Sequence, residues 1–132
     1  MLVTNIGLLA SKAVARLRAV RARRAMLAKV ERDGRALEHA SDELKADREV
    51  VLAAVKQAGV AVSYAAPQFR ADREVVLAAV KGEAWALCLA SASLKADREV
   101  VLAALKQDGS AIDFVAPELL SDPEVKAIIG KY

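Results

Sequence analysis

Residues 47–56 read DREVVLAAVK, and the identical string returns at 72–81. A copy with one substitution, DREVVLAALK, follows at 97–106, so that each copy begins 25 residues after the one before it. A degenerate copy precedes them at 22–46, and a truncated copy begins at Asp122. Self-similarity at a fixed period indicates a repeat architecture, in which a short unit buries its apolar face only against its neighbours.

The repeated string predicts an α-helix that begins after an aspartate. Asp47 offers a carboxylate to the free backbone N–H groups, Glu49 lies in the first turn and Lys56 in the last, so both ends suit the helix dipole. Gly59 follows, where a residue in the left-handed conformation is expected to close the helix. The third repeat has Ala84 at this position, so we expect its turn to differ in shape.

The apolar residues of this helix cover a wide arc. At roughly 100° per residue they span roughly 200°, which is more than one neighbouring helix can cover. We therefore expect each first helix to lie between the first helices of two adjoining repeats. In the second repeat these apolar residues are Val50, Val51, Leu52, Ala54 and Val55.

A shorter amphipathic helix near 60–66 is expected to follow, and then a turn whose Phe69 packs back into the core. Its equivalents are Leu44, Leu94 and Leu119. The sequence thus predicts an all-α protein of tandem two-helix repeats, stacked as a short right-handed-type α-solenoid or helical array. The predicted divisions are a basic amphipathic N-terminal helix (1–21), four repeats (22–46, 47–71, 72–96 and 97–121) and a truncated repeat acting as a C-terminal cap (122–132).

The string DREVVLAAVKQ, the glycine after it, a second short helix and a Leu-Lys-Ala-Asp junction together resemble the repeat called domain of unknown function 4116. The resemblance covers roughly residues 22–122. It implies an array of helical repeats, and it carries no established activity or catalytic residue to this chain. The first repeat departs most from the pattern, because Ala22 replaces the capping aspartate and Lys29 replaces an alanine.

Composition favours helices and excludes several classes of protein. The chain is 55% hydrophobic but only 4% aromatic, and alanine, which makes up the difference, loses no side-chain entropy in a helix. No uncharged apolar run reaches the length of a membrane span, so we expect a soluble protein without a transmembrane segment. The single cysteine, Cys88, excludes an internal disulfide and favours an intracellular compartment.

Positive charge is concentrated at the N-terminus. Residues 1–30 hold seven basic residues and no acidic one, although the whole chain is only +3. Three interpretations stay open: a charged helix that shields the first repeat, an organellar targeting segment, and a contact with nucleic acid or an anionic surface. Nucleic acid is the least favoured, because this segment has no aromatic residue for base stacking and the repeats are net acidic. The basic residues are Lys12, Arg16, Arg18, Arg21, Arg23, Arg24 and Lys29.

Few residues suggest chemistry. His39 is the only histidine, and the equivalent residues in later repeats are large and apolar or aromatic, so we expect a part-buried packing role and no metal site. Cys88 matches polar positions and is expected to be an inert surface thiol. The recurring Asp-Arg-Glu triplets are explained by helix capping and surface pairing.

Trp85 begins the second helix of the third repeat and is the best single candidate for a partner contact, with packing into the altered turn as the competing interpretation. No catalytic residue, metal or cofactor is predicted. The favoured function is a non-enzymatic scaffold or protein-binding module. The alternatives are a peripheral structural subunit of a larger, organellar assembly docked through the basic segment, and electrostatic binding of nucleic acid. The predicted partner-binding residues are Trp85, Arg16, Arg18, Arg21, Arg23 and Arg24.

Overall fold

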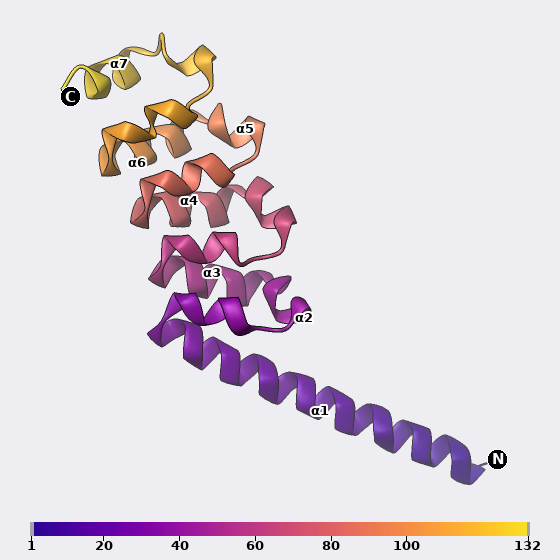
Figure 1. Cartoon of the computed structure of the whole chain (residues 1–132). Coiled ribbons are helices and arrows are strands. Elements are labelled where there is room, and N and C mark those ends of the chain that lie inside the picture. The colour runs from indigo at the N-terminus through magenta and orange to yellow at the C-terminus, as the bar shows by residue number, and fades with distance from the viewer. Residues whose placement is uncertain (1, 132) are drawn as a thin grey trace.

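The computed structural model describes residues 2–131, and every regular element in that range is a helix (Figure 1). The first helices of successive repeats lie one upon the next from one end of the array to the other (Figure 1). This confirms the expected all-α array of repeated helical units, while the hand of the array stays a prediction. The first helices are α1 (Leu2–Arg32), α3 (Arg48–Gln57), α4 (Arg73–Gly82), α6 (Arg98–Gln107) and α7 (Pro123–Ile129).

The second helix of each repeat, which the sequence predicted as a shorter helix, is a 3-10 helix. It spans only five or six residues between the end of the first helix and a buried turn. Such short runs suit the tighter 3-10 winding, whose hydrogen bonds close after three residues. These segments are η1 (Gly34–His39), η2 (Gly59–Ser63), η4 (Ala84–Leu89) and η5 (Gly109–Phe114).

The segment that closes each repeat has two forms, which alternate along the chain. In the first and third repeats it is a single α-helical turn, and the hydroxyls of Ser41 and Ser91 accept hydrogen bonds from backbone N–H groups three residues later. In the second and fourth it is a 3-10 turn that begins with Pro67 or Pro117, at a position where the missing N–H costs nothing. The structural period is therefore two repeats. The segments are α2 (Asp42–Lys45), η3 (Pro67–Ala71), α5 (Ala92–Lys95) and η6 (Pro117–Leu119).

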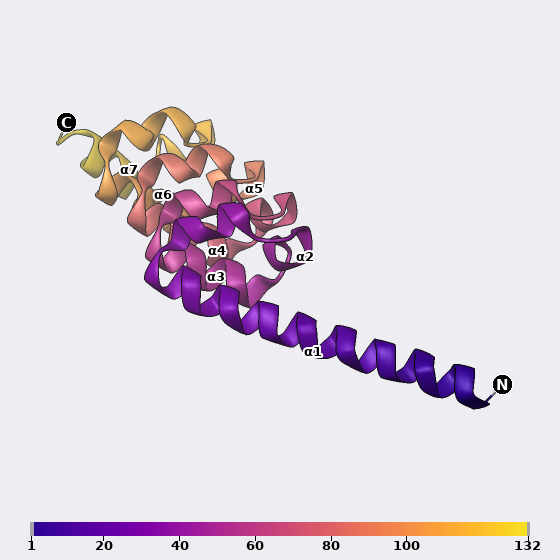
Figure 2. The ribbon, with the colours of Figure 1, turned by 60° about the horizontal axis from the view of Figure 1, so that its bottom comes forward.

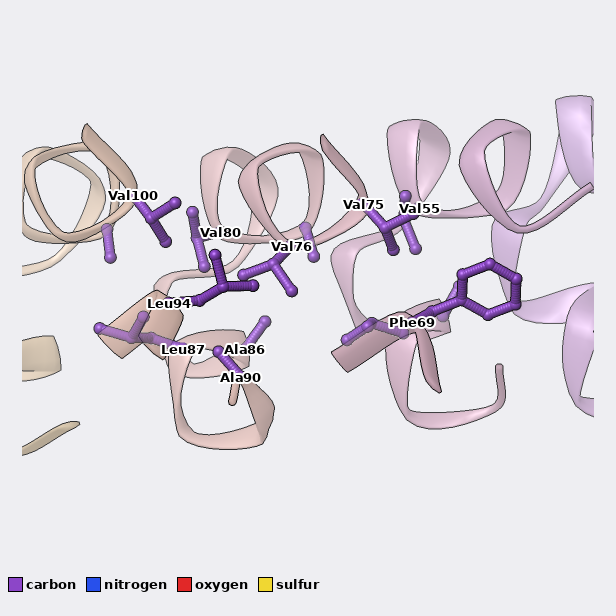
Figure 3. Close-up of a cluster of buried hydrophobic side chains, with 14 of the residues drawn as sticks. Val55, Phe69, Val75, Val76, Val80, Ala86, Leu87, Ala90, Leu94 and Val100 are labelled. Carbon is purple, nitrogen blue, oxygen red and sulfur yellow. The ribbon is translucent and has the colours of Figure 1, made fainter. Parts of the chain in front are cut away.

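The core lies between a layer of first helices and a layer of 3-10 segments (Figure 3). From α4, Val76 and Val80 point toward Ala86 and Leu87 of η4, and all four are buried (Figure 3). Fully burying a valine or leucine side chain stabilises the fold by about 1.5–3 kcal/mol. In α3 the buried residues belong to the predicted apolar arc, and Leu52 is half-buried at its edge.

The two ends of the array show which side of a first helix faces which neighbour. In α7, the last helix of the described residues, Val125 is buried, whereas Lys126 beside it is exposed. In α1 the pattern reverses, because Ala25 is exposed and Met26 is buried. Of these two adjacent positions, the first, which Val125 occupies in α7, therefore faces the preceding repeat. The second, which Met26 occupies in α1, faces the next repeat. Interior repeats carry buried valines at both positions, as expected for helices covered on two sides.

Backbone hydrogen bonds join successive repeats on the side of the closing turns. The N–H of Ala66 donates to the carbonyl of Lys45 at 2.9 Å, and the N–H of Ser91 donates to the carbonyl of Arg70 at 2.9 Å. A third bond in the same register, from Ala116 to Lys95, has the same length of 2.9 Å. The closing segments of successive repeats are therefore attached to one another, and α2, η3 and α5 also contact the first helix of the following repeat.

Helix α1 continues beyond the array as an arm, defined here as residues 6–22 (Figures 1 and 2). Every residue of the arm is exposed, and contact between α1 and the rest of the array begins at Arg23. The arm does not shield the first repeat, contrary to expectation. The reason is length, because α1 has 31 residues and its neighbour α3 has only 10, so α1 runs past the edge of the array.

The glycine after a first helix serves a close approach and not a left-handed turn. No glycine among residues 2–131 has a positive φ. Gly59 instead lies against α4, where a methyl group in place of its hydrogen would overlap the carbonyl oxygen of Ala79. Gly34 meets the carbonyl oxygen of Ala54 in the same way. Glycine therefore permits the close approach at these two junctions, whereas the third repeat accommodates the methyl group of Ala84 at the equivalent position.

The turn before Ala84 has the same shape as its counterparts, contrary to expectation. Glu83 precedes it with φ −141° and ψ 105°, and Ala58, at the equivalent position in the second repeat, has φ −146° and ψ 112°. Because this turn uses ordinary extended backbone, an alanine can follow it without strain in φ. The restriction on side-chain size comes from the neighbouring helix alone.

We expect Gly59→Ala to destabilise the protein by about 1–3 kcal/mol, as overpacking of a closed interface does. Gly82→Ala is the matched control, because the nearest atom to its added methyl group lies at 3.6 Å and alanine suits a helix better than glycine. Urea unfolding followed by circular dichroism measures both. Equal stability of the two variants would contradict the close-approach role of Gly59.

Candidate partner-binding face

Arginine side chains link each first helix to the next. Nε of Arg48 donates to Oδ2 of Asp72 at 2.8 Å, and Nη2 of Arg48 donates to Oε2 of Glu74 at 2.7 Å. The same pairing recurs at each junction from α1 to α7, and we call the set the arginine ladder. Its members are Arg23, Arg48, Arg73 and Arg98, with Asp47, Asp72, Asp97 and Asp122, and Glu49, Glu74, Glu99 and Glu124.

Each ladder aspartate has two functions. Oδ1 of Asp47 accepts hydrogen bonds from the backbone N–H groups of Glu49 and Val50, which caps α3, while Oδ2 accepts from Arg23. The hydrogen bond from Arg23 is the main reason that the pKa of Asp47 lies below its usual value. The same hydrogen bond, with a further one that Arg23 donates to Glu49, raises the pKa of Arg23. The triplets therefore cap their own helices and pair with the preceding repeat.

The arginine ladder ends at both ends of the array. In the first repeat, Ala22 and Arg24 occupy the positions where later repeats carry the accepting aspartate and glutamate. In α7, Pro123 occupies the position of the donating arginine. The two terminal repeats therefore lack the groups that would continue the ladder outward.

The predicted partner-binding arginines fall into two groups. Arg23 is half-buried and pairs with Asp47 and Glu49, so it belongs to the interface between repeats. The other four are exposed on α1 and lie outside the ladder. They are Arg16, Arg18, Arg21 and Arg24.

Trp85 lies on the surface of η4, where 41% of it is exposed. Its Nε1 donates to Oε2 of Glu83 at 2.6 Å, and Oε1 of the same carboxylate accepts a hydrogen bond from the backbone N–H of Val60 at 3.3 Å. The ring is therefore held at the surface by a carboxylate that is itself attached to the preceding repeat. It remains available to a partner.

The structure places the other two candidates apart from each other. Cys88 is half-buried in η4. His39 is exposed at the end of η1, whereas its equivalents Tyr64, Leu89 and Phe114 are half-buried. The expected part-buried packing role of His39 is therefore wrong. The first repeat has a neighbouring repeat on one side only, which leaves more of its surface uncovered.

A groove runs along the outer face of the first helices, and the sequence interpretation missed it. Its largest section, about 890 Å³, has Leu77 and Leu102 in its floor between α4 and α6. Two further sections, of about 440 and 380 Å³, continue it toward α1, and neighbouring sections share lining residues. We call the whole feature the outer groove. Its leucines are Leu27, Leu52, Leu77 and Leu102.

Charged side chains of opposite sign line the outer groove. Glutamates of the first turn and lysines of the last turn of the same helices both border it, with Glu99 and Lys106 of α6 as one such pair. The sequence interpretation assigned these residues to the helix dipole and, for the glutamates, to surface pairing. The overlooked signal was a leucine at the same position in every repeat, at the edge of the apolar arc. Leu27, Leu52 and Leu77 are half-buried there, and Leu102 is buried. The bordering residues are Glu49, Glu74, Glu99 and Glu124, with Lys56, Lys81 and Lys106.

The family model described as "Domain of unknown function (DUF4116)" matches residues 23–70 and 72–120. The chain belongs to this family. Each DUF4116 match spans two of the 25-residue repeats, which is the period at which serine-capped and proline-started closing turns alternate. No curated protein and no solved structure is detectably similar to this chain.

Residues 2–131 of this DUF4116 chain were searched for metal sites and for membrane-spanning helices. No group of three or more histidine, cysteine, aspartate or glutamate residues there could hold a metal ion. Within the same range, none of the helices combines the length and the apolar character that crossing a bilayer requires.

We expect Asp72→Asn to lower stability at neutral pH by roughly 0.2–1 kcal/mol, the range of exposed ion pairs. Asparagine still caps a helix, so the loss reports the charge that pairs with Arg48. Because the pKa of Asp72 is lowered in the folded state, mainly by Arg48, its contribution is complete above the ordinary aspartate value of about 3.9 and disappears as the pH falls through the lowered value.

The difference between Asp72→Asn and the unchanged protein should therefore shrink on acidification, when both have lost the same charge. Urea unfolding at a series of pH values measures it. Asp113→Asn is the control, because Asp113 is exposed and lies outside the arginine ladder. A difference that stays constant down to the acid limit would rule out the charge pairing.

Proposed function

We propose that this protein is a non-enzymatic protein-binding module that holds a partner along the outer groove. One observation carries the proposal: the groove crosses several repeats, and the second, third and fourth repeats supply it with the same kinds of side chain. In these repeats leucine forms the floor, glutamate lies at one end of each helix and lysine at the other, whereas in the first repeat Glu31 lines the groove at the lysine position. A surface built by repetition suits an extended ligand that presents a regular pattern.

The polar groups of the repeats support a structural and binding role over catalysis. The aspartates are occupied by capping and by the arginine ladder. No buried side-chain nitrogen or oxygen among the described residues lacks a hydrogen-bond partner. The repeating acids therefore have structural explanations and are not left over as candidates for acid–base chemistry.

The spacing of the helices favours a particular kind of partner. Packed helices lie about 8–10 Å apart, and an extended chain advances about 3.3 Å per residue. An extended segment that crosses the helices therefore passes one repeat about every three residues. We propose a segment with an apolar side chain at about every third position, and with acidic and basic side chains placed to meet the lysines and the glutamates.

We expect the double variant Leu52→Ser, Leu77→Ser to retain at least tenfold less partner than the unchanged protein. Both leucines are half-buried at the floor of the outer groove, so serine removes apolar contact area there. Affinity capture from an extract of the native source, with quantitation of each retained protein, makes the comparison.

Leu120→Ser is the matched control, because Leu120 is 40% exposed and lies outside the outer groove. Circular dichroism establishes that each variant is folded. If partners are retained equally by the groove variant and the control, the outer groove is not the binding face. Trp85→Ala tests the surface of η4 in the same experiment.

A second candidate is a peripheral structural subunit of a larger assembly, docked through the arm. The observation that favours it is exposure, because residues 6–22 project from the array and contribute nothing to its packing. Docking through the arm would leave the outer groove free.

Deletion of residues 1–21 tests this second candidate. We expect the truncated chain to unfold within about 0.5 kcal/mol of the intact one, because surface changes away from packed features fall within that range. Size-exclusion chromatography of native extracts then shows whether the truncated chain still enters the assembly. Unchanged assembly and localisation would eliminate docking through the arm.

A further inference from the structure

The arm exposes a continuous apolar stripe. Ile6 and Leu9 are each 65% exposed, Leu17 is 56% exposed and Val20 is 52% exposed. At roughly 100° per residue these four lie within a sector of roughly 80°, with Ala13 near its centre. No charged residue falls in this sector between residues 6 and 20. The stripe is about 22 Å long at 1.5 Å per residue.

The stripe is a different face from the one that packs on the array. Met26 and Val30, the buried residues of α1, lie roughly 120° around the helix from the centre of the stripe. Arg24 falls in the same sector as the stripe and ends it where the array begins. The array therefore leaves the stripe uncovered over residues 6–20 and reaches its edge only at Leu27, which is half-buried.

Positive charge borders the stripe on both sides. Arg16 and Arg21 lie roughly 60° and 80° from its centre in opposite directions, and Lys12 and Arg18 lie further round. All four are exposed, and no acidic residue occurs anywhere in residues 1–30. An apolar strip between arginines matches a surface that is negatively charged outside and hydrocarbon just beneath.

Other occupants match less well. A second copy of the arm would bring arginine against arginine with no acid to compensate. Nucleic acid would account for the charge but leave exposed aliphatic side chains without a function. Protein contacts of high energy centre on tryptophan, tyrosine and arginine, and the arm has arginines but no aromatic residue.

We propose that the arm binds the surface of membranes that contain anionic lipids, with α1 lying in the plane of the surface. The aliphatic stripe enters the boundary between headgroups and acyl chains, and the flanking arginines contact lipid phosphates. The array is then held beside the membrane. The proposal does not rest on partner binding by the outer groove.

Sedimentation of the full chain with vesicles tests the proposal. Vesicles of phosphatidylcholine alone are compared with vesicles that also contain phosphatidylglycerol, at low and at physiological salt. We expect binding to the mixed vesicles to be at least tenfold stronger, because surface binding sums apolar burial and electrostatic attraction. No binding to the mixed vesicles overturns the proposal and leaves the arm to a protein partner.

A pair of double variants separates the stripe from general hydrophobicity. Leu9→Ser, Leu17→Ser removes two stripe residues, and we expect it to weaken vesicle binding at least tenfold. Leu8→Ser, Val14→Ser removes residues of similar exposure, 55% and 46%, on other sides of the helix, and we expect less than a threefold effect. Equal losses in the two variants overturn the proposal.

The contribution of charge is tested separately. Arg16→Gln, Arg21→Gln should weaken binding to the mixed vesicles at least fivefold and reduce its sensitivity to salt. A duplex DNA of unrelated sequence is the competing probe. If the intact chain binds this DNA as tightly as the vesicles, and the stripe variant binds both as well as the intact chain does, the arm is a simple polycation and the proposal fails.

Discussion

Each interior first helix carries apolar residues on two sides, and the whole structure depends on covering both. A ten-residue helix followed by a five-residue 3-10 segment has too little surface to do this alone. The period of 25 residues brings an equivalent helix to each side, and valine meets the neighbouring repeat at every interior junction. The glycine after the helix, the arginine ladder and the backbone bonds between closing turns all act at these same junctions.

The sequence predicted those parts of the fold whose residue types recur at the 25-residue period. The aspartates mark the starts of α3, α4 and α6 to the residue, and the apolar arc matches the buried faces. What it missed depends on contacts between repeats. The role of Gly59 depends on the carbonyl oxygen of Ala79, 20 residues later in the chain. The hydrogen-bond partners of Arg48, Asp72 and Glu74, lie 24 and 26 residues later. The fixed period made that pairing discoverable, since an arginine one repeat earlier lies beside each capping aspartate.

The array carries two candidate binding surfaces, the arm and the outer groove, and they differ in how much of each could be predicted from the sequence. The arm was visible as a run of basic residues, but its projection from the array required the length of α1 to be compared with that of α3. The outer groove was hidden because its leucines and charged residues already had explanations within a single helix. Only the alignment of helices in space turns Leu52 and Leu77 into the floor of one surface.

The way in which the arginine ladder ends bears on how such a chain can lengthen. Ala22 has no carboxylate to accept a hydrogen bond from an arginine, and Pro123 has no guanidinium to donate one. A repeat added before α1 or after α7 would therefore lack an ion-pair partner at the new junction. A repeat inserted between α3 and α6 would have an ion-pair partner on both sides. Copying from within, in blocks of two so that serine and proline turns keep their order, preserves every junction. The identical strings at 47–56 and 72–81 lie in that interior.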